Sequence, residues 1–178
     1  MPQAATHLII ALIIGGLIRD YLIKDKKKFP LHYVLILGLA GILPDLDIAV
    51  YWVLHWFGFT ISEVHRTFTH NLFVPLIFLA LAGISWKWKN KSLGKHKLKI
   101  HTIFWIIALG ILIHLALDAS IAGKIMPFYP VSYYSIGNTY IESLPMPLSK
   151  IFFPSLDAAL IILWLIYLEW KHKISDFI

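Results

Sequence analysis

The sequence predicts an all-α fold: a polytopic membrane helix bundle of about five transmembrane helices, forming a single membrane-embedded domain over residues 1–178. Composition is the first observation, because 58% hydrophobic and only 15% charged residues, with a mean hydropathy of +0.72, are far from the averages of soluble domains. The second is the presence of apolar stretches long enough to cross a bilayer. The third is that no internal repeat or low-complexity linker divides the chain, which favours one compact bundle.

Five apolar stretches account for the predicted helices, at residues 4–23, 31–57, 69–88, 100–123 and 154–170. The first is interpreted as a mature helix, because it lacks the basic start and small-residue cleavage site of a signal peptide. The second is interrupted at Pro44, which has no backbone N–H to donate. The third begins beside His70, and the fourth carries His114 and Asp118. The fifth has Asp157 in its predicted first turn, where a carboxylate typically stabilises a helix start.

Lysines flank these stretches asymmetrically. They follow the first, third and fifth stretches, as Lys24, Lys26, Lys27, Lys28, Lys87, Lys89, Lys91, Lys95, Lys97, Lys99, Lys171 and Lys173. By the positive-inside rule these segments are cytoplasmic, which places the N-terminus outside the cell membrane and the C-terminus in the cytoplasm. The segments after the second and fourth stretches carry only Arg66, Lys124 and Lys150 and are predicted to lie outside. Because topology explains most of the +6 net charge, nucleic-acid binding is disfavoured.

This topology brings polar residues of different helices to one depth. Counted from the cytoplasmic end at about 1.5 Å per residue, His114 lies about 21 Å and Asp118 about 27 Å into a core about 30 Å thick. Asp45 lies about 21 Å in by the same count. His7 is near the outer end of the first helix, and His70 opens the third from the outer side. Ionisable groups are costly in a membrane, so their convergence in one outer layer predicts a shared site.

His114 and Asp118 are four residues apart, a spacing that places both side chains on one helix face, where they can reach the same cation. The chain has no cysteine, so a metal would be held by His, Asp or Glu. Each group also has a simpler interpretation. His114 and Asp118 can form an ion pair or proton relay, and His7 can be a hydrogen-bonded bundle residue. Asp45 is the preferred ligand of the interrupted helix and Asp47 the second choice, because a carboxylate after a break can instead cap the new helix.

The connection before the third helix contains His65, Arg66 and His70. Loops collect polar residues, so this segment is either structural or part of the site. The planar guanidinium of Arg66 matches phosphate or carboxylate oxygens as a lysine does not. The long outer segment 124–153 is open to interpretation as a lid, a substrate groove or a plain connection.

The ordered motifs resemble a known family. They are Thr6-His7, Pro44-Asp45-Leu46-Asp47, His65-Arg66-Thr67-Phe68-Thr69-His70, His114-Leu115-Ala116-Leu117-Asp118 and Gly123-Lys124-Ile125-Met126-Pro127-Phe128. Over nearly the whole chain this set is similar to the YdjM-like (DUF457) family of membrane-bound, metal-dependent hydrolases. Many relatives have Gly after the His-Arg pair and Ser after the last His, where this chain has Thr67 and Asn71. More distantly, the order of motifs is similar to the zinc-dependent phospholipase C and P1 nuclease superfamily of helical phosphodiesterases.

The resemblance implies a hydrolase, and with it we expect one or two divalent metal ions near the outer membrane surface. His and Asp ligands favour Zn²⁺, with Mn²⁺ or Fe²⁺ as alternatives. The expected ligands of the first ion are Asp45, His65, His114 and Asp118. Asp118 would bridge to a second ion that His7 and His70 help hold. A third ion is not expected, because no His follows Asp118 before the predicted cytoplasmic His172.

Catalysis would then involve Arg66 and Asp118, with Arg66 holding the non-bridging oxygens of a phosphoester. The depth of the site favours a membrane lipid or a lipid-linked small molecule as substrate. Two rival hypotheses use the same residues: a cation- or proton-coupled transporter built beside the broken second helix, and a membrane scaffold with a structural metal. The sequence makes no prediction about oligomeric state.

Overall fold

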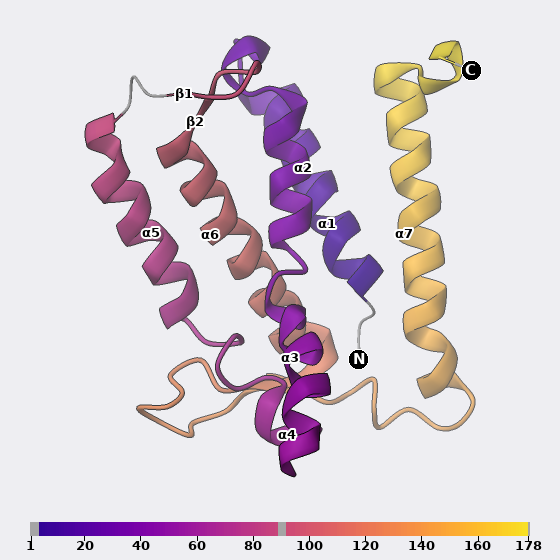
Figure 1. The fold of residues 1–178 in the computed structure, drawn as a ribbon. Coiled ribbons are helices and arrows are strands. Elements are labelled where there is room, and N and C mark those ends of the chain that lie inside the picture. The colour runs from indigo at the N-terminus through magenta and orange to yellow at the C-terminus, as the bar shows by residue number, and fades with distance from the viewer. Residues whose placement is uncertain (1–3, 89–91, 178) are drawn as a thin grey trace.

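The computed structural model describes residues 4–88 and 92–177 of the chain as a set of helices with two short hairpins (Figure 1). The helices are α1 (Ala4–Leu17), α2 (Leu31–Ala40), α3 (Asp47–Leu54), α4 (Ile61–Val64), α5 (Phe73–Ser85), α6 (Ile100–Leu117) and α7 (Leu148–His172). The hairpins are antiparallel, β1 (Ser92–Leu93) with β2 (Leu98–Lys99) and β3 (Gly123–Ile125) with β4 (Ile136–Asn138). The all-α membrane bundle expected from the sequence is therefore confirmed.

Three of the described helical segments are long and apolar enough to cross a membrane: Ala4–Leu22, Ile100–Ile121 and Leu148–His172. A fourth span is possible if Leu31–Ala40 and Pro44–Phe57, which are bent by 50° at their break, count as one. The apolar helix Phe73–Trp88 is shorter than these spans. The predicted count of about five is thus three or four by length and composition, because the third stretch forms a helix that starts only at Phe73 and the second is bent at its break.

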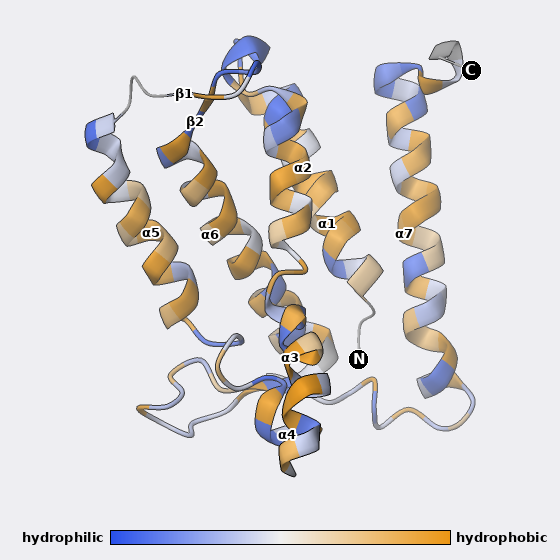
Figure 2. Cartoon of the chain, in the orientation of Figure 1, coloured by the Kyte–Doolittle hydropathy of each residue, from blue (hydrophilic) through white to orange (hydrophobic). Residues whose placement is uncertain are grey.

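The two ends of the bundle differ in composition and structure (Figures 1 and 2). The β1–β2 hairpin, the turn between α1 and α2 and the C-terminal end of α7 lie at one end, where the lysines give the blue colour of Figure 2. The start of α1, helices α3 and α4 and the segment between α6 and α7 lie at the opposite end. Grouping of the lysine-rich segments at a single end agrees with the predicted topology; which end faces the cytoplasm stays a prediction.

Small residues let α1, α2 and α6 approach closely. A Cβ atom added at Gly110 would lie 2.5 Å from the Cβ of Ala40, and one added at Gly38 would lie 2.6 Å from a methyl carbon of Leu12. Small residues at such crossings are common in membrane bundles, where close backbone packing drives helix association. This contact holds the end of α2 against the middle of α6 and so fixes the position of the broken segment that follows.

Helix α7 is attached differently. It packs on α1 and is otherwise largely exposed, with Phe153 and Asp157 as its buried residues. It begins at Leu148, earlier than the predicted residue 154, so Asp157 lies well inside the helix and not in its first turn. The prediction that Asp157 stabilises a helix start is therefore wrong.

Candidate metal centre

Side chains from four separate parts of the chain meet at the end of the bundle opposite the lysine-rich segments. α1 supplies His7, the turn before α3 supplies Asp45, the connection between α4 and α5 supplies His65 and His70, and α6 with its π-helical extension supplies His114 and Asp118. His7, His70, His114 and Asp118 are each no more than 2% exposed. Buried ionisable groups in a membrane protein mark functional sites more often than structural ones.

The break in the second helix lets two neighbouring carboxylates reach the same imidazole. Pro44 begins a 3₁₀ turn, Pro44–Leu46, and α3 starts at Asp47. The Asp45 Oδ1 atom lies 3.5 Å from His70 Nε2, and Asp47 Oδ2 lies 3.2 Å from His70 Nδ1. In a regular helix residues two apart point to different sides, so the irregular backbone after Pro44 is what brings both carboxylates to His70.

Local hydrogen bonds shape the connection that carries His65 and His70. Thr60 and Glu63 form a capping box at the start of α4, in which the Glu63 carboxylate accepts hydrogen bonds from the Thr60 backbone and hydroxyl, and these bonds lower the pKa of Glu63. Thr67 Oγ1 donates to the Val64 carbonyl at 2.7 Å. Asn71 Oδ1 accepts from the backbone N–H groups of the first turn of α5, at 3.0 and 3.2 Å. Thr67 and Asn71, the two departures from the family pattern, therefore both have structural roles here.

Four atoms form the centre of the cluster. The Nε2 atoms of His70 and His114 are 3.1 Å apart. Asp45 Oδ1 lies 3.5 Å from His70 Nε2 and 3.6 Å from His114 Nε2. Asp118 Oδ2 lies 3.5 and 3.6 Å from the same two nitrogens. Ligands at about 2.0–2.1 Å from a tetrahedral Zn²⁺ are roughly 3.3–3.4 Å from one another, so these separations are those of a coordination shell.

The hydrogen bonds behind the two imidazoles fix which nitrogens carry lone pairs. His114 Nδ1 lies 2.7 Å from the Gly41 carbonyl oxygen, which can only accept, so Nδ1 is protonated. His70 Nδ1 faces the Asp47 carboxylate in the same way. In the neutral state each ring then presents a lone pair at Nε2, and the two lone pairs face each other. Such a contact needs a proton or a cation between the rings, and the carboxylate or carbonyl behind each ring is the usual support of a metal-bound histidine.

The charges of the cluster also favour a divalent cation. Asp45, Asp47 and Asp118 contribute three negative charges, and Arg66 contributes one positive charge. With neutral histidines the group has a net charge of −2, and buried charge of this size is costly unless it is compensated.

Three groups of residues have ligand atoms within 4.8 Å of one another: His70 with His114 and Asp118, Asp45 with His65 and His70, and His7 with Asp45 and His114. All six residues therefore belong to one continuous centre. The grouping differs from the expected division between two ions, because His70 joins His114 and Asp118 while His65 lies with Asp45 and His70.

Asp47 lies outside the three groups. Its Oδ1 atom is 2.9 Å from His65 Nδ1, its Oδ2 atom is near His70 Nδ1, and Thr69 Oγ1 donates to Oδ2 at 2.7 Å. The sequence left open which of Asp45 and Asp47 is the ligand. The structure brings Asp45 to the Nε2 atoms at the centre and Asp47 to the opposite, Nδ1 edges of His65 and His70.

His7 completes the wall of the centre. Its ring stacks on that of His114 with the ring centroids 3.9 Å apart, and its Nε2 atom lies 3.4 Å from Asp118 Oδ1. His7 Nδ1 is buried without a hydrogen-bond partner among the described residues. Beside it, Thr6 Oγ1 donates to the buried carboxylate of Asp157 on α7. Thr6 and Asp157 were not expected at the site; the signal was a second polar residue next to His7 in an otherwise apolar stretch.

Arg66 has an unusual backbone. Its φ of 64° lies in the left-handed region, which costs energy for a residue with a Cβ and is concentrated at functional sites. Its backbone N–H donates to Asp47 Oδ2 at 3.3 Å, and its Nε lies 3.6 Å from Asp118 Oδ2. Gly123, beside the guanidinium on β3, has a φ of 123°, which favours glycine, and a Cβ added there would lie 2.9 Å from Arg66 Nη1.

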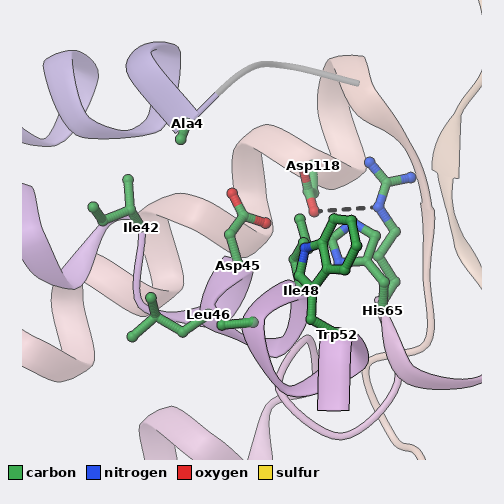
Figure 3. Close-up of a pocket in the computed structure, with 10 residues that line it drawn as sticks. Ala4, Ile42, Asp45, Leu46, Ile48, Trp52, His65 and Asp118 are labelled. Atoms are coloured by element: carbon green, nitrogen blue, oxygen red, sulfur yellow. Dashed lines mark ion pairs between the residues drawn. The ribbon is translucent and has the colours of Figure 1, made fainter. Parts of the chain in front are cut away.

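A cavity of about 500 Å³ opens beside the cluster. Asp45, His65, Arg66 and Asp118 form its polar wall, and Ala4, Ile42, Leu46, Ile48, Ala49 and Trp52 form the rest. Figure 3 shows the carboxylates of Asp45 and Asp118 at this wall, with the ion pair from Asp118 to the guanidinium of Arg66. A small molecule in the cavity would contact the cluster on one side and apolar groups on the other.

Comparison with known proteins agrees with the resemblance of the motifs. A model of the family described as YdjM inner membrane protein matches residues 1–174. The chain belongs to this family. No curated protein and no solved structure matches the chain. YdjM membership and the candidate spans together make it a multi-pass membrane protein.

Proposed function

We propose that the chain is an integral membrane, metal-dependent hydrolase that cleaves a phosphoester in a lipid or lipid-linked substrate. The observation that carries the proposal is that two imidazole Nε2 atoms lie 3.1 Å apart and that two carboxylate oxygens each lie 3.5–3.6 Å from both of them. Structural ion pairs join opposite charges, whereas this centre joins lone pairs to lone pairs and carries excess negative charge.

One or two divalent ions would be held by Asp45, His65, His70, His114 and Asp118, with His7 as a further ligand. Nitrogen and oxygen donors near tetrahedral spacing favour Zn²⁺, with Mn²⁺ or Fe²⁺ as alternatives. A bound ion of this kind lowers the pKa of a coordinated water and polarises a phosphoryl oxygen.

The two oxygens of Asp118 face different partners, as a bridging carboxylate requires. Oδ1 faces His7, while Oδ2 faces His70, His114 and Arg66. This supports the assignment of Asp118 as the ligand shared by two ions.

The other residues position groups for the reaction. Arg66, which lines the cavity and reaches Asp118, would bind the non-bridging oxygens of the phosphoester and stabilise the charge that builds up on them. Asp47 would hold the rings of His65 and His70 in the required tautomer through their Nδ1 atoms. The largely apolar cavity, at the end of the bundle away from the lysine-rich segments, supports a lipid entering from the outer leaflet.

The proposal is tested first by metal content. Purified protein should retain one or two equivalents of a divalent metal in elemental analysis, and His114→Ala and Asp118→Ala should each lose at least tenfold of it. His96→Ala, at the lysine-rich end, is the matched control and should retain the metal. Full retention by both site variants, with folded protein shown by an unchanged elution volume, would contradict the assignment.

The broken second helix beside the cluster favours one alternative, a cation- or proton-coupled transporter, because transporters bind ions at such breaks. Gradient-dependent ion flux in proteoliposomes, absent from His114→Ala, would support it. Against it, the ligands gather at one end of the bundle and the sequence has no two-fold internal repeat. A purely structural metal would instead give loss of stability on chelation without any turnover.

A further inference from the structure

A second, smaller cavity adjoins the first. It has a volume of about 300 Å³ and is lined by residues that include His65, Arg66 and Lys124. His65 and Arg66 also line the larger cavity, so the two cavities are neighbours on either side of these side chains. A ligand that occupied both would contact Arg66 in each.

The two cavities differ in chemistry. The larger has an apolar wall that includes Ile42, Leu46, Ile48 and Trp52. The smaller adds a second cation, Lys124, to the guanidinium of Arg66. Lys124 is exposed and forms no ion pair with any residue in the described ranges 4–88 and 92–177. One carboxylate is close: Glu142 Oε1 lies 3.6 Å from a Cβ added at Gly123, on the rim beside Arg66.

The backbone fixes the place of Lys124. It pairs with Gly137 across the β3–β4 hairpin, and a Cβ added at Gly137 would lie 2.7 Å from the Lys124 Cα. A Cβ added at Gly123, the residue before Lys124, would lie 2.9 Å from Arg66 Nη1. The close approach of the two strands therefore fixes the backbone of Lys124 beside Gly123, and its side chain lines the smaller cavity together with Arg66 but does not line the larger one.

We infer that the substrate is a lipid diphosphate or a lipid with an equivalent pair of directly joined anionic groups. This rests on the proposed function. The apolar chain lies in the larger cavity, the first phosphate lies at the cluster and Arg66, and the second anionic group lies at Lys124. Because His65 and Arg66 line both cavities, a second anionic group joined directly to the first phosphate is the shortest ligand that reaches both, and a diphosphate provides it. Lys124 is thus a specificity-determining residue for the headgroup.

Titration calorimetry on the metal-loaded protein in detergent tests this inference with three ligands: dodecyl diphosphate, dodecyl phosphate and methyl diphosphate. Dodecyl diphosphate should bind about tenfold more tightly than dodecyl phosphate, and methyl diphosphate, which lacks the chain, should bind at least tenfold more weakly than dodecyl diphosphate. In Lys124→Gln the preference for the diphosphate over the monophosphate should disappear while binding of dodecyl phosphate stays the same. Lys150→Gln, an exposed lysine at the same end of the bundle, is the matched control and should keep the preference.

The apolar cavity has its own pair of variants. Trp52→Ala should weaken binding of both dodecyl compounds about equally, whereas Trp56→Ala, 87% exposed and outside the cavity lining, should change neither.

An unchanged diphosphate preference in Lys124→Gln would overturn the inference, as would equal binding of methyl and dodecyl diphosphate. These outcomes leave the proposed hydrolase untouched, because metal content and turnover test it separately. Conversely, a protein that shows the Lys124-dependent preference but no turnover would refute the hydrolase and retain the headgroup site.

Discussion

Each end of the bundle contains a buried aspartate among titratable neighbours, and the two surroundings are opposite in character. At the lysine-rich end, the Asp20 carboxylate accepts a hydrogen bond from Tyr167 at 2.7 Å and pairs with Arg19, Lys26 and His172 at 2.9–3.4 Å. At the other end, three carboxylates meet four imidazoles and a single arginine. Asp20 is fully compensated by donors and cations, so it needs no further ligand. The centre around Asp118 is undercompensated, which is what a cation site requires before the cation binds.

The comparison separates a structural aspartate from a functional one. Asp20 joins α1 to α7 through Tyr167 and His172, at the end where Gly16 lets α1 approach Tyr167. Its partners are all hydrogen-bond donors. Asp118 Oδ2 faces the Nε2 atoms of His70 and His114, whose ring protons lie at Nδ1 and point toward Asp47 and Gly41. Burial is thus common to Asp20 and Asp118, whereas the direction of the neighbouring protons differs and favours a cation only at Asp118.

The largest expected effect is that of Asp118→Asn. The side chain keeps its size but loses the charge that two ions would share, so we expect metal affinity to fall at least 100-fold and turnover to become undetectable. Competition with a chromogenic chelator measures the first, and phosphate release the second. Metal binding of unchanged affinity would refute the contrast between the two ends.

Asp20→Asn should have the opposite pattern. Removing one partner from a buried charge network costs on the order of 3 kcal/mol, so the melting temperature should fall while metal affinity stays within twofold of the parent protein. His55→Ala, at an exposed site, is a control for nonspecific loss of stability. Loss of metal in Asp20→Asn with an unchanged melting temperature would show that the two ends are not independent.

A smaller effect on metal is expected from Asp47→Asn, because Asp47 orients ligands without being one of the central four. Partners behind metal-bound histidines typically contribute 10–100-fold in affinity. Glu63→Gln is the matched control, since Glu63 lies in the neighbouring helix α4 and its carboxylate bonds to Thr60 in the capping box. If Asp47→Asn lost metal as completely as Asp118→Asn, Asp47 would be a direct ligand.

The smallest effect is that of Thr6→Val, which removes the hydroxyl that donates to Asp157. One buried hydrogen bond contributes about 1 kcal/mol, so we expect a small fall in melting temperature and little change in metal affinity. Thr102→Val, on an apolar groove between α5 and α6, is the control. A large loss of metal in Thr6→Val alone would indicate that α7 holds His7 in place.

The sequence predicted the parts of the site that depend on short-range spacing. His114 and Asp118 are four residues apart on one helix, and the lysine pattern placed His7, Asp45 and His70 at the same depth, so their convergence followed from helix geometry and topology. Helix geometry could not decide between Asp45 and Asp47, because their positions depend on how the chain turns after Pro44. The grouping of the histidines could not be predicted from the sequence either. It depends on ring orientations that the Gly41 carbonyl and the Asp47 carboxylate set.

Contacts of polar side chains, one long-range and one local, explain the remaining differences. Asp157 was predicted to lie in the first turn of a helix that begins at residue 154, but α7 starts at Leu148 and the carboxylate accepts a hydrogen bond from Thr6, 151 positions away in the chain. The third apolar stretch was predicted to begin at residue 69, yet Asn71 caps a helix that starts at Phe73. In both cases the apolar pattern located the helix. Polar side chains set the remaining features: Asn71 the start of α5, and Asp157 the contact of α7 with Thr6.

The most direct test of the account is anomalous diffraction at the zinc edge from crystals of the metal-loaded protein. The account predicts a peak between the Nε2 atoms of His70 and His114, within bonding distance of Asp45 and Asp118. A peak at another place, or protein with intact side-chain density there and no peak after loading, would contradict the claim that these residues form a metal centre.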